Sequence, residues 1–226
     1  MSKTILITGA GRGIGRQLAL QSLDSGASVI ACARRIGDLD DLVAKGAEAQ
    51  SLEVTDLDAI NSLKAALGDR PIDILFNNAG IIGPDRQAIG DMDIDGWRET
   101  MEVNVYAPYR VSEALVDNVA ASEHRTIVVV SSRMGSMSLN TVSDRFIYRT
   151  SKAAVNQVVV CMANEWRPRG IRVVATHPGW VSTDMGGSAA PVTPAESAAG
   201  LLKVANGMTD EASGRFWNFD GEELSW

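Results

Sequence analysis

Residues 3–15 decide the fold, and they read Lys3-Thr4-Ile5-Leu6-Ile7-Thr8-Gly9-Ala10-Gly11-Arg12-Gly13-Ile14-Gly15. The run up to Thr8 predicts a strand, and residues 16–23 predict a helix directly after the glycines. This order is typical of a phosphate-binding turn, because glycine lets backbone N–H groups approach a pyrophosphate at the positive end of the helix. The spacing Thr-Gly-x-x-x-Gly-x-Gly is one register away from Gly-x-Gly-x-x-Gly, and three glycines could also form only a tight turn.

Strand and helix patterns alternate along nearly the whole chain after this turn. Such alternation predicts an α/β, three-layer Rossmann-type fold, with a parallel sheet of about seven strands and helices on both faces. We expect one domain over residues 1–226. A capping box at residues 193–196 predicts a helix that runs to about residue 206. Beyond the first strand, the expected strands are residues 27–33, 49–54, 72–76, 126–130, 171–175 and 216–219.

The composition limits the classes of function. The chain has 226 residues, 45% of them hydrophobic, and a net charge of -7. The acidic balance argues against a nucleic-acid surface, which needs clustered Lys and Arg. No apolar run approaches the roughly 20 residues of a membrane helix, and the start of the chain has no cleavable signal pattern. We therefore expect a cytoplasmic protein that binds neither nucleic acid nor membrane.

The cysteines and histidines are few and far apart. Cys32 and Cys161 lack metal-like spacing, so we expect two buried, reduced thiols. His124 and His177 are the only histidines and cannot form a metal cluster by themselves. The sequence therefore predicts no metal site.

Tyr148 and Lys152 are spaced i and i+4, so on a helix they share one face. A neighbouring ammonium favours the phenolate, which predicts that Lys152 lowers the pKa of Tyr148 toward neutrality. A tyrosine packed on the core beside a solvated lysine would give the same spacing. The rest of the chain must decide between these two interpretations.

The tip of the second predicted strand carries Arg34 and Arg35 and no acidic residue. In dinucleotide-binding units an acid at this tip accepts from the ribose 2′-hydroxyl, whereas an Arg accommodates a 2′-phosphate. Arg34, with Arg12 as a second cation, therefore favours NADP(H) over NAD(H). Arg35 is better explained as an exposed loop charge.

Polar side chains mark three further positions. Asn77-Asn78-Ala79-Gly80 ends the fourth predicted strand and Ser132 follows the fifth, where ligands meet an open α/β sheet. Pro108 has no N–H for the carbonyl of Asn104, which predicts a kink with a free carbonyl in a helical segment over residues 97–121. Ordinary turns, caps and kinks would give the same patterns.

Together these motifs resemble the short-chain dehydrogenase/reductase family over essentially the full chain. The chain is most similar to the compact carbonyl-reductase and C-factor-like members, through Tyr-Arg-x-Ser-Lys and the ending from residue 218 to residue 226. The motifs that carry the resemblance are residues 8–15, residues 77–80, Asn104, Ser132, Tyr148-x-x-x-Lys152 and Pro178-Gly179.

The resemblance implies roles for four catalytic residues. Tyr148 would give a proton to the substrate carbonyl oxygen or take one from the alcohol. Lys152 would lower the pKa of Tyr148 and hold the nicotinamide ribose. Ser132 would hydrogen-bond the substrate oxygen, and Asn104 would hold a water that links Lys152 to solvent.

The resemblance also implies a set of cofactor contacts. Glu53 stands where the family commonly has Asp to meet the adenine, and the segment after residue 179 is short, which implies an open substrate pocket. We expect Met134, Phe146, Trp180 and Met185 to form its walls. The implied cofactor residues are Gly9, Arg12, Gly13, Ile14, Gly15, Arg34, Glu53, Asn78, Ala79, Gly80, Tyr148, Lys152, Pro178, Gly179, Val181 and Thr183.

The expected function is that of an NADP(H)-dependent oxidoreductase that interconverts a ketone or aldehyde and an alcohol. The alternative is a dinucleotide-binding regulatory or signalling protein with little or no turnover. The expected partner is a small carbonyl or alcohol substrate. The resemblance and the very apolar helix that carries Tyr148 predict a homodimer or homotetramer built on the two long helices.

Overall fold

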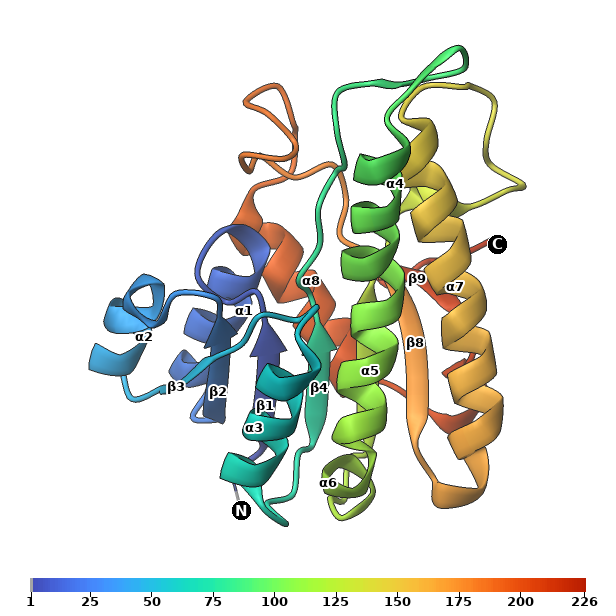
Figure 1. The fold of residues 1–226 in the computed structure, drawn as a ribbon. Helices are drawn as coiled ribbons and strands as arrows, with labels where there is room; N and C mark the ends of the chain where they lie inside the picture. The colour runs from blue at the N-terminus through green and yellow to red at the C-terminus, as the bar shows by residue number, and fades with distance from the viewer. Residues whose placement is uncertain (1) are drawn as a thin grey trace.

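The structure is a computed structural model that describes residues 2–226. Its main sheet has eight strands in the order β10-β9-β8-β7-β4-β1-β2-β3 (Figure 1). Neighbouring strands are parallel except for the antiparallel pair of β10 and β9. The strands are β1 (Thr4–Thr8), β2 (Ser28–Ala33), β3 (Glu48–Ser51), β4 (Ile74–Asn77), β7 (Thr126–Val130), β8 (Arg172–His177), β9 (Phe216–Asn218) and β10 (Glu223–Leu224), with a separate hairpin of β5 (Gln87–Ala88) and β6 (Asp91–Met92).

Helices cover both faces of the sheet (Figure 1). One apolar cluster joins the sheet to α3, α5 and α7, and the other joins it to α1, α2 and α8. The burial of these two apolar layers is the main favourable term in folding. The helices are α1 (Gly13–Asp24), α2 (Asp40–Ala44), α3 (Leu57–Leu67), α4 (Ile94–Met101), α5 (Ala107–Ala114), α6 (Val116–Ala120), α7 (Phe146–Trp166) and α8 (Pro194–Asn206).

The predicted α/β fold is confirmed. The predicted helix over residues 194–206 is also confirmed, because Thr193 and Glu196 exchange the two hydrogen bonds of a capping box. The sheet has eight strands rather than about seven, since the short β10 adds an antiparallel edge to it. The third strand ends at Ser51 rather than residue 54, because Glu53 begins a turn and accepts from the backbone N of Thr55 at 3.2 Å.

The helical segment around Pro108 is irregular near the predicted place. A π-helical turn, Glu102–Tyr106, lies between α4 and α5 and contains the buried Asn104. Pro108 then lies in the first turn of α5, where its missing N–H is tolerated. The predicted helical segment therefore runs through α4, the π-helical turn and α5 without a break, and a turn at Leu115 separates it from α6.

The outward face of α7 differs from expectation. Cys32 is buried as predicted, whereas Cys161 is exposed. Cys161 lies on a solvent-facing stripe of α7 with Gln157 and Asn164, so the prediction of two buried thiols was wrong. Within residues 2–226, no helix combines the length and the hydrophobicity needed to cross a membrane.

The sheet order creates an edge where a ligand can bind. β1 leads on one side to β2 and β3 and on the other side to β4, β7 and β8. Such a reversal opens a crevice beyond the carboxyl ends of the strands. The parallel register aligns these ends, since Ile7 pairs with Phe76 and Asn77 with Val129.

Candidate active site

Tyr148 and Lys152 lie one turn apart on α7 and are both buried, with 8% and 5% of their surfaces exposed. The Lys152 Nζ is 5.7 Å from the centroid of the Tyr148 ring. It donates a hydrogen bond of 2.9 Å to the carbonyl oxygen of Val130, at the end of β7. α7 therefore places a phenol and an ammonium at the carboxyl edge of the sheet.

Burial is the main cause of the pKa shifts of Tyr148 and Lys152. Burial raises the pKa of Tyr148 to about 12, and a hydrogen bond with Ser132 partly opposes this rise. The predicted fall of the Tyr148 pKa toward neutrality is therefore not seen in this structure. Burial also lowers the pKa of Lys152 to about 8, because an apolar environment disfavours its charged form. The phenol therefore keeps its proton at neutral pH.

Ser132 follows β7 directly and is buried beside Tyr148. Its Oγ accepts from the backbone N of Met134 at 3.1 Å, which forms the start of a short 3₁₀ turn, Arg133–Gly135. Asn156 attaches this segment to α7: its Oδ1 accepts from the Ser131 Oγ at 2.5 Å, and its Nδ2 donates to the Gly135 carbonyl oxygen at 3.3 Å. The hydroxyl of Ser132 is thus fixed against the helix that carries Tyr148.

Asn104 connects parts of the site through its side chain, whereas the predicted kink concerned its backbone carbonyl oxygen. Its Oδ1 accepts from the backbone N of Ile81 at 2.9 Å, and its Nδ2 donates to the Ile81 carbonyl oxygen at 2.8 Å. The same Nδ2 donates to the Ser151 Oγ at 3.0 Å. Asn104 thereby ties the chain after Gly80 to α7.

Two positions of the glycine turn, Gly9 and Gly15, have no room for a side chain. Gly9 has a φ of +68°, and a Cβ on Gly15 would lie 2.2 Å from the Gly9 carbonyl oxygen. The Nδ2 of Asn78 closes the turn by donating to the carbonyl oxygens of Thr8 and Gly9 at 3.0 and 3.2 Å. Arg12, the N-cap residue of α1, makes no side-chain hydrogen bond to the helix. This bare backbone at a helix N-terminus fits the pyrophosphate of a dinucleotide.

The segment after β8 reaches back to the glycine turn. The Cγ2 of Thr183 would lie 3.2 Å from a Cβ on Gly13. Arg12, the predicted second cation, forms an exposed ion pair of 2.9 Å with Asp184. Gly179 has a φ of +87° and packs against Phe219. Loop and turn therefore border the same crevice.

Arg34 lies at the end of β2 with 74% of its side chain exposed. Its Nη1 is 3.9 Å from a carboxylate oxygen of Glu53, so both predicted adenosine contacts lie at one place. An exposed guanidinium at this position fits a 2′-phosphate. The nearby carboxylate would instead repel a phosphate.

The predicted pocket walls lie on three different segments, the turn after β7, the start of α7 and the loop after β8. Phe146 packs edge to face on Trp97, with ring centroids 5.4 Å apart. Trp180 and Met185 are exposed on the loop after β8. The four wall residues therefore stay a prediction.

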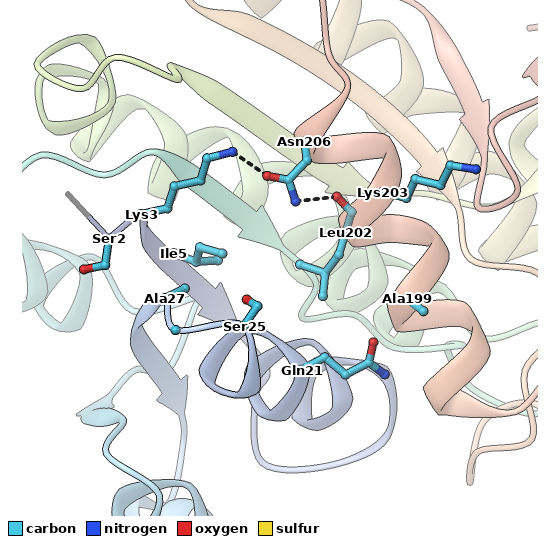
Figure 2. A pocket seen from close by; sticks show the side chains of 11 residues that line it. Ser2, Lys3, Ile5, Gln21, Ser25, Ala27, Ala199, Leu202, Lys203 and Asn206 are labelled. Carbon is cyan, nitrogen blue, oxygen red and sulfur yellow. Dashed lines mark hydrogen bonds between the residues drawn. The ribbon is translucent and has the colours of Figure 1, made fainter.

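A pocket of about 480 Å³ lies away from these residues, between α1 and α8. Lys3, Gln21, Leu202 and Asn206 line it, and Lys3 donates to Asn206 (Figure 2). It is at the opposite end of the sheet from Tyr148, because Lys3 precedes β1 and Asn206 ends α8. No catalytic candidate contributes to this pocket.

Three residues that support the site were not predicted from the sequence. Gly135, Asn156 and Gln87 hold the segments around Tyr148 through contacts over 17 or more positions. Polar residues at ordinary spacings give no local signal of such contacts. Only the short distance between Asn156 and Lys152, one helical turn, could have suggested that Asn156 shares the catalytic face.

Replacing Lys152 with methionine is expected to stabilise the fold by about 2 kcal/mol at pH 7. Each unit by which folding lowers the lysine pKa costs roughly 1.4 kcal/mol of folding free energy, and methionine removes this cost. Loss of the hydrogen bond from Lys152 to Val130 offsets part of the gain. Between pH 8 and 10.5 the unfolded chain keeps a proton that folded Lys152 has released, so this residue makes the wild type more stable as pH rises. The advantage of Lys152→Met should shrink over that window. Urea unfolding at pH 7 and pH 10 measures the difference in stability between Lys152→Met and wild type, with Lys203→Met, at an exposed position, as control. A Lys152→Met variant that is less stable than wild type at pH 7 would contradict the prediction.

The comparisons with known proteins agree with this geometry. The family described as short chain dehydrogenase matches residues 3–192. C-signal of Myxococcus xanthus is 41% identical over 156 residues, which are 69% of this chain and 93% of that protein. The 1-hydroxy-2-glutathionyl-2-methyl-3-butene dehydrogenase of Rhodococcus sp. (strain AD45) is 34% identical over 230 residues and 99% of both chains.

Among solved structures, the NADPH-bound carbonyl reductase from chicken fatty liver superposes with a TM-score of 0.92. It is 31% identical in sequence, and the match covers 100% of this chain and 99% of that chain. Fold, glycine turn and sequence matches therefore lead to one conclusion: this chain belongs to the short-chain dehydrogenase/reductase family of oxidoreductases.

Proposed function

We propose that the protein is an NADP(H)-dependent oxidoreductase that interconverts a ketone or aldehyde and an alcohol, with Tyr148 as general acid and base. The observation that carries the proposal is the buried group of Ser132, Tyr148 and Lys152 at the carboxyl edge of the sheet, the edge that also holds the glycine turn after β1. The similarity to an NADPH-bound carbonyl reductase supports it.

A bound nicotinamide dinucleotide would supply or accept the hydride. In reduction, Tyr148 gives its proton to the carbonyl oxygen, and Ser132 donates a hydrogen bond to the same oxygen. The charge of Lys152 stabilises the phenolate that forms. Asn104 holds a water through which the proton is replaced from solvent.

The raised pKa of Tyr148 favours the reductive direction at neutral pH, because the phenol then carries the proton that reduction consumes. Oxidation needs the phenolate and should accelerate as pH rises. Loss of NADPH absorbance over a panel of aldehydes and ketones tests the proposal. Turnover of at least one compound supports it, whereas cofactor binding without turnover across the panel would overturn it.

The second candidate is a dinucleotide-binding regulator with little turnover. The specific observation in its favour is the 41% identity to a protein named C-signal. The buried proton donor speaks against it, because a sensor has no use for an acid beside a hydride donor. The same assay separates the two candidates.

NADP(H) is the proposed cofactor, with Arg34 as the contact to the 2′-phosphate. Arg34→Asp is expected to weaken NADPH binding by roughly 10- to 100-fold and NADH binding by less than about threefold, because a hydrogen bond to a charged group contributes roughly 1.5–3 kcal/mol. Calorimetric titration with both cofactors measures this. Arg35→Asp is the matched control, since Arg35 pairs with Asp38. Equal losses for NADPH and NADH would contradict the assignment.

The remaining cofactor contacts are proposed from the same edge of the sheet. The turn residues supply backbone N–H groups, and the loop after β8 closes the opposite side. These contacts are Gly9, Arg12, Gly13, Ile14, Gly15, Glu53, Asn78, Ala79, Gly80, Pro178, Gly179, Val181 and Thr183.

The oligomer is proposed to be a homodimer or homotetramer that pairs α7 with the helices around Pro108. Tyr106 and Tyr109 are exposed on these helices, and Val160 is half-buried on α7. Light scattering with size exclusion gives the mass directly.

A further inference from the structure

Gln87 is a buried polar residue outside the proposed catalytic group. It lies in the hairpin of β5 and β6, which follows β4 and precedes α4 in the sequence. Only 5% of its surface is exposed. A buried carboxamide is costly unless its donors and acceptor are satisfied. Its partners therefore show what it does.

The carboxamide of Gln87 joins two segments that are far apart in sequence. Its Nε2 donates to the carbonyl oxygens of Ile82 and Pro84, at 3.0 and 2.6 Å. Its Oε1 accepts from the backbone N of Tyr148 at 3.0 Å. One side chain thus binds the loop after β4 and the backbone of the proposed acid.

Among residues 2–226, no other side chain caps the start of α7. The residue before the helix, Arg145, has a φ of 52° and gives no side-chain hydrogen bond to it. The first N–H groups of a helix lack partners within the helix, and the N–H of Tyr148 is one of these. Gln87 supplies the missing acceptor from 61 positions away.

Other contacts hold the same two segments together. A Cβ on Gly83 would lie 3.3 Å from the Cγ2 of Ile147, so the loop packs directly on the first turn of α7. The Asn104 bonds to Ile81 and Ser151 provide a second link one turn further along. The loop is continuous with the cofactor-binding candidates Asn78 to Gly80, so its position relates Tyr148 to the cofactor crevice.

We infer that Gln87 is a positioning residue for the reaction: it fixes the first turn of α7 against the loop after β4 and thereby sets the place of the Tyr148 hydroxyl. The inference rests on the proposed function of Tyr148. Gln87 contacts the backbone of Tyr148, and its effect acts through that residue. Misplacement of a reacting group by about 1 Å can cost roughly 100-fold in rate.

Two variants test the inference. Gln87→Met keeps the length of the side chain and removes all three hydrogen bonds, so kcat should fall roughly 10- to 100-fold while the Kd for NADPH stays within about twofold. Gln87→Glu can still accept from Tyr148, but its carboxylate faces two carbonyl oxygens. Only the protonated acid can donate to one of them.

The sign of the pH effect follows from this chemistry. Burial and the two carbonyl oxygens raise the pKa of Glu at position 87 above its ordinary value of about 4.3. Gln87→Glu should therefore be most active at acidic pH and lose kcat as pH rises through that pKa. Wild type and the control Gln21→Glu should lack this loss, since Gln21 lines the pocket between α1 and α8, at the opposite end of the sheet from Tyr148, and donates to the carbonyl oxygen of Ala195.

Amide hydrogen exchange of Tyr148 gives a readout that needs no turnover. The Tyr148 amide should exchange at least about tenfold faster in Gln87→Met than in wild type, with no comparable change at Val159 on the same helix. A kcat within twofold of wild type in Gln87→Met, a pH profile of Gln87→Glu that matches the control, or an unchanged Tyr148 amide would each overturn the inference. Absence of turnover in wild type would overturn the proposed function instead, and amide exchange would still decide the role of Gln87.

Discussion

Tyr148→Phe is expected to lower kcat for carbonyl reduction by roughly 10²- to 10⁴-fold, the range that general acid catalysis contributes. The substitution removes one hydroxyl and keeps the ring, which is buried on α7. The Kd for NADPH should stay within about threefold of wild type. Steady-state kinetics with the best substrate of the panel, together with calorimetric NADPH binding, measures both quantities.

Tyr109→Phe is the matched control. Tyr109 is exposed on α5, and its hydroxyl donates to Glu113 at 2.6 Å. Its loss should leave kcat within twofold of wild type. A Tyr148→Phe enzyme with a kcat close to that of the control would remove Tyr148 from the acid role, and Ser132 would become the next residue to test.

Gly135→Ala is expected to destabilise the fold by roughly 3 kcal/mol, at the upper end for an overpacked core site, and to lower kcat as well. A Cβ at this position would lie 2.6 Å from the backbone C of Lys152 and 2.8 Å from its Cβ. Because the obstacle is helix backbone, the turn that follows Ser132 must move away from α7. The distance between the Ser132 and Tyr148 hydroxyls would then increase.

Gly37→Ala separates this clash from a general effect of replacing glycine. A Cβ on Gly37 would meet no atom within 4 Å, and Gly37 has no positive φ. Urea unfolding of both variants should show a loss of stability only in Gly135→Ala. Equal stability and equal kcat in the two variants would mean that the turn and α7 are not held as closely as the structure describes.

The glycine turn was predictable because its requirements are local. A positive φ at Gly9 and close backbone packing at Gly15 restrict these positions to glycine. The capping box at Thr193 is also local, and so is the i, i+4 spacing of Tyr148 and Lys152. Each pattern acts within about one turn of chain, so it can be seen in the sequence.

Long-range support of the site was not predictable in this way. Gln87 and Tyr148 are 61 positions apart, and Ser131 and Asn156 are 25 apart. No local sequence pattern around Gln87 or Asn156 indicates which distant residue it will hydrogen-bond. The exposure of Cys161 had the same cause, because a helix rich in apolar residues does not show which of its faces the sheet will cover.

Patterns in the amino-acid sequence were enough to predict the parallel α/β fold, the position of the glycine turn and the placing of a phenol and an ammonium on one helix face. The electrostatics of these two groups depend on how the chain packs around them, which raises the pKa of Tyr148 to about 12 and lowers that of Lys152 to about 8. The physical reason is that spacing along a helix fixes which groups are neighbours, whereas desolvation depends on every segment that packs around them. That packing is the sum of contacts between distant parts of the chain.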